Sequence, residues 1–210
     1  MLDYSFERRV LAQGDFSGPL AGLDEAGRGP VVGPVVAAAV ILDPNRVPLG
    51  LDDSKRLSPA ERDRLEGEIK AAARSWAVAF ACPGEIARLN IIGASFLAMR
   101  RALDGLNPRP RLALVDGPEL RFHFPRLGMP AMGVVGGDAR AASIAAASIL
   151  AKTARDRLMR ALDSFFPGYG FAENKGYGRP ALEALRKLGP TPFHRWSWNA
   201  VRQTELLDRR

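Results

Sequence analysis

The longest apolar run of this 210-residue chain, residues 31–42, constrains its fold more than any other feature. The run is twelve residues long and contains Gly33 and Pro34, whereas a helix that spans a membrane needs about 20 apolar residues. Valine is its commonest residue, and β-branched residues favour strands. We therefore predict a buried strand in a soluble globular protein.

Shorter periodic segments around this run predict a mixed α/β domain. Leu20–Leu23 should form a strand joined to the long run by the glycine turn Gly27-Arg28-Gly29. Ser58 and Glu61 match a capping box, which predicts a helix over 59–74. The other expected elements are strands over 75–81, 111–116 and 131–135 and helices over 83–106 (broken near 90–93), 139–165, 180–188 and after 195. This order is typical of an α/β sheet.

The chain divides into one main domain and two flanking regions. We predict an arm or short helix over 1–17, the main domain over 18–166 and a helical region over 167–210. A domain of this size buries a sizeable core without covalent links. The single cysteine, Cys82, excludes an intramolecular disulfide framework. The charged N-terminus does not match a signal peptide, so we expect a cytoplasmic protein with no membrane partner.

The charge balance indicates an anionic partner. The chain has 30 Lys and Arg against 23 Asp and Glu, which gives a formal net charge of +7. A basic excess of this size favours nucleic acid, with genome base composition as the alternative explanation for so many arginines. The two histidines, His123 and His194, belong to no shared motif, which disfavours chemistry that needs a pair of histidines.

Four acidic residues stand at strand ends beside glycines rather than on exposed helix faces. Asp24 and Glu25 end the first strand, Asp116 ends a later one, and Asp138 follows a glycine pair and opens the long helix. Functional groups of α/β sheets gather at such strand ends. Converging carboxylates repel one another unless cations intervene, and hard oxygen ligands select Mg²⁺ or Mn²⁺. With the basic surface, these acids predict a metal-dependent nuclease.

Each acid also has a structural interpretation. Asp138 is well placed to cap the helix that follows it, and Asp116 suits a simple turn. Asp24 and Glu25 would face opposite sides of a regular strand, so both reach one site only if the strand ends or bulges there. Asp156 lies one helical turn after a lysine and should pair with it, outside the metal site.

Six motifs in a fixed order resemble those of bacterial ribonuclease HII. The resemblance runs from about residue 20 to residue 198. It is carried by GLDEAGRGP at 22–30, DSKRLS at 53–58, VDG at 115–117, GD at 137–138, AAASILAK at 145–152 and KGYG at 175–178. One acidic pair is a weak signal, whereas six motifs in family order are a specific one.

The resemblance implies a ribonuclease H-like fold of type 2. That fold is a mixed five-stranded sheet flanked by helices, with residues 18–166 as the catalytic domain and a small C-terminal helical appendage, 167–210, that completes the substrate site. The implied activity is hydrolysis of the RNA strand of RNA–DNA hybrids and nicking of duplex DNA 5′ of a single embedded ribonucleotide. It leaves 3′-hydroxyl and 5′-phosphate ends after in-line attack by an activated water. A monomer is the default state.

The resemblance also assigns residues to the site. The catalytic acids, which bind two Mg²⁺ or Mn²⁺ ions, correspond to Asp24, Glu25, Asp116 and Asp138. The expected substrate-binding residues are Gly27, Arg28, Gly29, Lys55, Ser148, Lys152 and Tyr177. Glycines let backbone groups approach a sugar closely, and Tyr177 resembles the family tyrosine that bonds the 2′-hydroxyl, the group that distinguishes RNA locally. The alternatives are a turn aromatic for Tyr177 and ordinary surface positions for Lys55, Ser148 and Lys152.

The sequence departs from the family pattern near its end. Asn174 replaces a common histidine, and Arg179-Pro180 replaces the start of a common Thr-x-x-His; both affect the tail and not the metal acids. The short segment before the first motif disfavours the related ribonuclease HIII. Gln203–Leu207 loosely resembles a sliding-clamp-binding peptide, with a plain terminal helix as the alternative.

Two other functions stay open at this point. Another two-metal nuclease on the same fold, such as a junction resolvase, would cut without needing a 2′-hydroxyl. A non-catalytic nucleic-acid-binding module would bind without metal and would tolerate Asp116→Asn.

Overall fold

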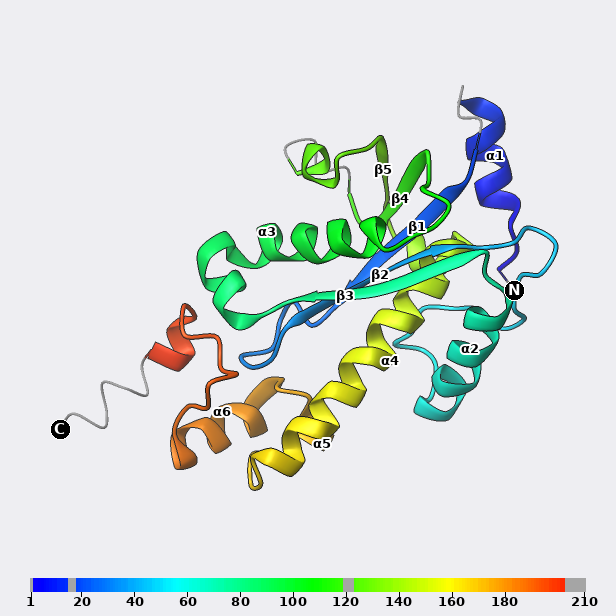
Figure 1. Cartoon of the computed structure of the whole chain (residues 1–210). Coiled ribbons are helices and arrows are strands. Elements are labelled where there is room, and N and C mark those ends of the chain that lie inside the picture. The colour runs from blue at the N-terminus through cyan, green and yellow to red at the C-terminus, as the bar shows by residue number, and fades with distance from the viewer. Residues whose placement is uncertain (1, 15–17, 119–122, 203–210) are drawn as a thin grey trace.

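Five strands form one mixed sheet at the centre of the computed structural model, which describes residues 2–14, 18–118 and 123–202 (Figure 1). The strands are β1 (Leu20–Ala26), β2 (Val35–Ile41), β3 (Ser75–Ala81), β4 (Leu112–Asp116) and β5 (Ala131–Val134). Their order across the sheet is β3-β2-β1-β4-β5. β2 is antiparallel to β1 and β3, whereas β4 is parallel to β1 and β5. The predicted mixed five-stranded sheet is confirmed.

Helices cover both faces of the sheet (Figure 1). α3 (Pro83–Asp104) packs on one face, and α4 (Ala142–Phe165) and α2 (Pro59–Ala72) pack on the other. The shorter helical segments are α1 (Ser5–Gln13), η1 (Phe124–Leu127), η2 (Gly137–Ala139), α5 (Phe171–Asn174) and α6 (Gly178–Leu188). Within the described residues, no helix is long and apolar enough to cross a membrane.

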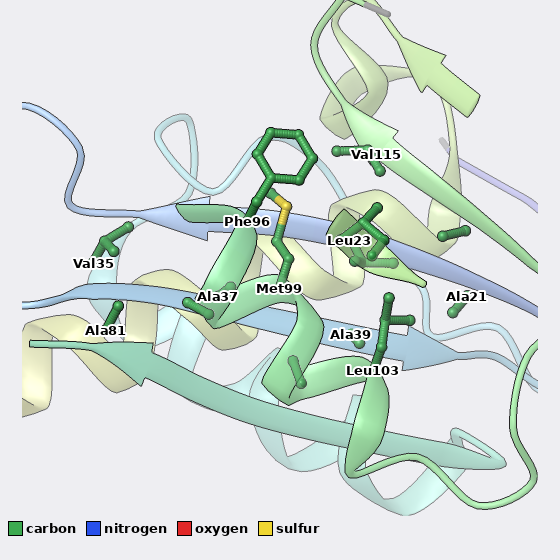
Figure 2. Packing of buried hydrophobic residues seen from close by; sticks show 14 of the residues in the cluster. Ala21, Leu23, Val35, Ala37, Ala39, Ala81, Phe96, Met99, Leu103 and Val115 are labelled. Carbon is green, nitrogen blue, oxygen red and sulfur yellow. The ribbon is translucent and has the colours of Figure 1, made fainter. Parts of the chain in front are cut away.

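Alternate residues of β2 belong to two apolar cores. Val35 and Ala37 lie in the core under α3, and Ala38 and Val40 lie in the core under α4. Figure 2 shows the first of these cores, where α3 side chains pack beside β1 and β2. Because β2 is buried on both faces, its sequence is a continuous apolar run rather than an alternating one.

Two predicted elements begin at least three residues later than expected. The strand predicted over 31–42 begins only at Val35, because Val32 forms an isolated bridge with His194 in the C-terminal region. The helix predicted from residue 139 begins at Ala142, because the short turn η2 precedes it. The predicted break in the third helix is confirmed, since Asn90 has a φ of 57° inside α3.

The first turn of α4 is completed by a residue from α1. The N-cap position of α4 is Ala141, which offers no side-chain acceptor. Glu7 Oε1 instead accepts hydrogen bonds of 2.7 Å from the backbone N–H and the hydroxyl of Ser143. A carboxylate is favoured at a helix N-terminus by the unpaired N–H groups there. Residues 5–13 are therefore a docked helix and not a free arm.

The C-terminal region packs on the second half of α4. A separate apolar cluster joins the two, made of Val32, Met159, Leu162, Tyr169 and Phe171. α5, α6 and the helical residues 199–202 form the predicted small helical appendage. Figure 1 shows this region, in orange and red, beside the far end of α4. Its contacts with residues 31–33 place it next to the predicted glycine turn.

Candidate active site

Three carboxylates meet at the edge of the sheet where the parallel strands end. Asp24 lies near the end of β1, Asp116 is the last residue of β4, and Asp138 lies in η2 after β5. One oxygen from each carboxylate lies within 4.8 Å of the others. The parallel register, which pairs Leu23 with Val115, brings Asp24 beside Asp116. The sheet topology therefore assembles three of the four predicted acids.

Burial and mutual repulsion make the carboxyl groups of Asp24 and Asp138 hard to ionise. Asp24 and Asp138 are each 7% exposed. Burial, followed by the charges of Glu25 and Asp116, raises the pKa of Asp24 well above its usual range. Burial and the charge of Asp116 also raise the pKa of Asp138. Metal ions relieve this kind of strain by supplying positive charge between the oxygens.

The donor set of this cluster fits a hard divalent cation. All three ligating atoms are carboxylate oxygens, the ligands that Mg²⁺ and Mn²⁺ prefer. Lys55 provides a partial counter-charge, with its Nζ 3.8 Å from Asp138 Oδ2 and 3.9 Å from Asp53 Oδ1. Its side chain is 76% exposed, so the lysine can move away and leave the carboxylates to a metal ion.

Glu25 lies beside the three-acid group rather than within it. β1 keeps a regular register with β2 through Ala26, so neighbouring residues face opposite sides of the strand. Glu25 Oε1 accepts a hydrogen bond of 3.1 Å from Arg28. It nevertheless lines the same cavity as Asp24 and Asp116, and burial raises its pKa despite the arginine. The sequence predicted that Asp24 and Glu25 reach one site only if the strand ends or bulges there. Because β1 continues regularly through both residues, Asp24 belongs to the three-acid group and Glu25 lies beside it.

A cavity of about 580 Å³ is lined by Asp24, Glu25 and Asp116 together with the predicted substrate contacts. Every residue predicted to bind substrate lines it, namely Gly27, Arg28, Gly29, Lys55, Ser148, Lys152 and Tyr177. Gly27 has a φ of 94°, which favours glycine. A Cβ added to Gly29 would lie 3.5 Å from the Tyr177 ring, so the glycine turn and the tyrosine are neighbours. Tyr177 therefore lies at the cavity wall, and its role in substrate binding stays a prediction.

Lys152 and Ser148 each have a protein partner at the cavity wall. Lys152 Nζ lies 2.6 Å from Asp156, which also bonds to Arg62 at 3.2 Å. The predicted Lys152–Asp156 pair is therefore confirmed, and Asp156 is outside the three-acid group. The Ser148 hydroxyl is 2.8 Å from that of Ser54, and its hydrogen bonding also favours the ionised form of Asp24.

The alternative that Asp138 caps the long helix is wrong. α4 begins at Ala142 after the N-cap Ala141, so Asp138 lies before the cap position. Asp116 is tied to the same turn, because its Oδ1 accepts a hydrogen bond of 2.7 Å from the N–H of Gly137. That bond orients the Asp116 carboxylate and brings η2 close to the end of β4.

Sequence reasoning missed two buried arginines behind the glycine turn. Arg155 and Arg195 are 1% and 0% exposed. Arg195 donates to the carbonyl oxygens of Gly27, Arg28 and Gly33. Arg155 lies in α4 beside other charged residues, a pattern that usually indicates a solvated helix face. The one sequence feature that pointed to such residues is the glycine motif, because its backbone carbonyl groups need hydrogen-bond donors once they are buried.

The departure at Asn174 keeps the local turn intact. Its Nδ2 donates to Tyr169 O at 2.7 Å, and its Oδ1 accepts from Gly176 N–H at 2.7 Å. Arg179, in the second departure, is exposed and pairs with Glu183. Asn174 thus holds the segment that presents Tyr177. The possible clamp-binding peptide, Gln203–Leu207, lies outside the described residues.

Comparisons with known proteins agree with these features. A family model described as ribonuclease HII matches residues 21–201. A ribonuclease HII of Caulobacter vibrioides is 55% identical over 185 residues, which are 88% of this chain and 86% of that protein. The crystal structure of ribonuclease H2 from Pyrococcus horikoshii has a TM-score of 0.78 at 26% identity and covers 92% of this chain and 100% of that one. Ribonuclease HII in complex with PCNA from Archaeoglobus fulgidus has a TM-score of 0.74 at 28% identity, covering 88% and 96%.

Proposed function

This chain belongs to the ribonuclease HII family, and we propose that it nicks duplex DNA on the 5′ side of a single embedded ribonucleotide by a two-metal-ion mechanism. As a member of the family it is a metal-dependent endoribonuclease that acts on the RNA of RNA–DNA hybrids. The observation that carries this proposal is one cavity lined by Asp24, Glu25 and Asp116 together with the glycine turn and Tyr177.

The acids would hold the metal ions. Asp24, Asp116 and Asp138 are the proposed ligands, and Glu25 completes the set from the neighbouring position. Two Mg²⁺ or Mn²⁺ ions would supply an activated water and stabilise the leaving 3′-oxygen, which yields 3′-hydroxyl and 5′-phosphate ends. The Gly137 N–H holds the Asp116 carboxylate in orientation, so this ligand is preorganised before metal binds.

The glycine turn and Tyr177, which line the same cavity, would recognise the ribonucleotide. We assign the backbone of Gly27, Arg28 and Gly29 and the Tyr177 hydroxyl to the ribose with its 2′-hydroxyl, the group that separates RNA from DNA. Lys55, Lys152 and Ser148 also line the cavity, and we assign them to contacts with the phosphates. Because Tyr177 and Asn174 belong to the C-terminal region, residues 167–210 would complete the site that residues 18–166 begin.

The decisive experiment uses a DNA duplex that carries one ribonucleotide in a 5′-labelled strand. We expect a nick on the 5′ side of the ribonucleotide with Mg²⁺ or Mn²⁺, and none with chelator. An all-DNA duplex and Asp116→Asn are the controls; the variant should stay folded because asparagine keeps an oxygen for Gly137. Cleavage of a long hybrid without any nick at the single ribonucleotide would contradict the recognition proposal, and an active Asp116→Asn would contradict the metal site.

A weak contact with a sliding clamp is a second, separate proposal. Its support is the QTELL sequence at 203–207 and the archaeal relative that was crystallised with PCNA. A clamp pull-down should recover the wild type but not the double variant Gln203→Ala, Leu206→Ala. Equal recovery of both proteins would discard the proposal. The monomeric state and the cytoplasmic location stay predictions.

A further inference from the structure

Two buried arginines support the glycine turn from behind. Arg155 of α4 and Arg195 of the C-terminal region are almost fully buried. Among the described residues, neither forms an ion pair with a carboxylate, although buried arginines usually have one. Burial and the neighbouring Arg155 lower the pKa of Arg195 to about 9, so its guanidinium is charged at neutral pH. Their partners are backbone carbonyl groups.

Arg195 binds one turn through every nitrogen of its guanidinium. Its Nη2 donates to Gly27 O at 2.5 Å, its Nη1 to Arg28 O at 2.8 Å and its Nε to Gly33 O at 3.0 Å. The backbone of this arginine is itself fixed, because its N–H donates to Val31 O at 2.9 Å. One side chain therefore sets the direction of three carbonyl groups.

The direction of these carbonyls also sets the direction of two amides. In a trans peptide the N–H points away from the C=O of the same plane, and the peptides of this turn are trans. Fixing the carbonyls of Gly27 and Arg28 toward Arg195 thus directs the N–H groups of Arg28 and Gly29 away from it. Both residues line the cavity, and within the described residues neither N–H has a backbone or side-chain acceptor.

Arg155 connects this turn to the segment that carries Tyr177. It donates to Val32 O at 3.3 Å and to Lys175 O at 3.2 Å, and its guanidinium lies 5.3 Å from the centre of the Tyr177 ring. The space is tight, because a Cβ on Gly27 would lie 2.1 Å from Arg155 Nε. The turn, the tyrosine and the two arginines therefore form one rigid unit.

We propose that Arg195 is a positioning residue that aims the Arg28 and Gly29 amides at the ribose and phosphate of an embedded ribonucleotide. The inference rests on the proposed function and adds the residue that enforces its selectivity. A long hybrid offers neighbouring 2′-hydroxyls and an A-form shape as further contacts, whereas a single ribonucleotide in DNA offers only one. If the Arg28 and Gly29 amides lose their direction, cleavage at a single ribonucleotide must therefore fall more than cleavage of a long hybrid.

The test compares kcat/KM on two duplexes of equal length, one with a single ribonucleotide and one with a full RNA strand. Arg195→Lys keeps the charge but loses the planar fork that reaches three carbonyls. We expect the ratio of the two values to shift against the single ribonucleotide by about tenfold or more. Leu65 is a residue of α2 that is buried in the core under α4. Leu65→Ala is the control for lost stability and should leave the ratio unchanged. Assays are run well below the melting temperature of every variant.

A milder variant covers the case in which Arg195→Lys does not fold. The Arg195 guanidinium lies 5.1 Å from the Trp198 ring centre, so Trp198→Leu loosens the arginine without removing it and should shift the ratio in the same direction. An unchanged ratio in a folded variant would overturn the inference. A wild type that does not cut the single-ribonucleotide duplex would overturn the proposed function itself, and the inference with it.

Discussion

At the scale of single residues, the buried acids that would bind metal lower the stability of the metal-free protein. Asp24 is buried against Asp116 and Glu25, so without metal the folded protein holds carboxylates that repel one another. Asp24→Asn should therefore raise the free energy of unfolding of the metal-free protein by about 1 kcal/mol. Mn²⁺ should raise the melting temperature of the wild type but not of the variant. A less stable metal-free variant, measured by urea denaturation with chelator, would argue against this strain.

Replacing Tyr177 should separate recognition of the single ribonucleotide from general binding of the duplex. The ring lies beside Gly29 and under the guanidinium of Arg155, while 42% of the side chain is exposed to the cavity and solvent. Tyr177→Ala should reduce cleavage at a single ribonucleotide far more than it weakens binding of an all-DNA duplex, as measured by gel shift. Tyr177→Phe keeps the ring and removes only the hydroxyl, so a loss of cleavage in this variant as well would assign recognition to the hydroxyl rather than to the ring. Equal losses of cleavage and binding would make the tyrosine a packing residue.

The single residues also show what a sequence can reveal about a site. The meeting of Asp24, Asp116 and Asp138 was predictable because several acids at strand ends beside glycines are a stronger signal together than any one of them, each of which has a structural interpretation of its own. Arg195 was not, because its role depends on a turn far away in the chain. The sequence predicted the separation of Glu25 from the other acids only for a strand that stays regular through both residues. Local patterns did not decide whether it does, and the structure shows that β1 stays regular to Ala26.

At the scale of elements, β1 and α4, which both contribute residues to the cavity wall, lie in close contact. Gly22 makes this approach possible, because a Cβ there would lie 2.1 Å from the carbonyl carbon of Ser143. Gly22→Ala should destabilise the protein by about 1–3 kcal/mol and reduce activity, since it moves Ser148 and Lys152 away from Asp24. The measurements are urea denaturation and cleavage of a hybrid.

Gly67 provides the matched control for this prediction. It lies in α2, has a helical φ and would place a Cβ in open space, with no atom within 4 Å. Gly67→Ala should stabilise the protein by about 0.5–1 kcal/mol and leave activity unchanged. A neutral Gly22→Ala, beside a stabilising Gly67→Ala, would show that α4 can shift without cost.

Element boundaries were the part of the fold that the sequence predicted least well. The apolar pattern of 31–42 indicates burial but does not distinguish pairing inside the sheet from the bridge between Val32 and His194. The start of α4 was misplaced because its first turn is capped by Glu7, a residue from another helix. In both cases a partner distant in sequence, which local patterns do not contain, decided the boundary.

At the scale of the whole molecule, a neutral histidine joins the C-terminal region to the catalytic domain. His194 is fully buried, and its Nδ1 accepts a hydrogen bond of 2.9 Å from Thr191 N–H. Burial lowers its pKa from 6.5 to about 4. The unfolded chain therefore binds a proton below pH 6.5 that the folded chain binds only near pH 4. The stability that this residue contributes is complete above pH 6.5 and is lost as the pH falls.

Between pH 7.5 and pH 5, His194 should account for about 2 kcal/mol of lost stability. His194→Asn keeps an acceptor near the Nδ1 position and removes the titration, so its unfolding free energy should fall less over this range. The raised pKa values of Asp24 and Asp138 make the folded state more stable as the pH falls, which opposes the effect of the histidine. This contribution is the same in both proteins. The difference between their unfolding free energies therefore reports the histidine alone. Parallel pH profiles of the two proteins in urea denaturation would contradict the prediction.

The link between Arg28 and Arg195 has a consequence for how the protein is made. The two residues are 167 positions apart, so the ribosome has exposed the sheet and the acids long before it adds the arginine that fixes the turn. Asp24, Asp116 and Asp138 are therefore synthesised well before Arg195. The carbonyl groups of the neighbouring turn gain their buried donor only when the chain is nearly complete.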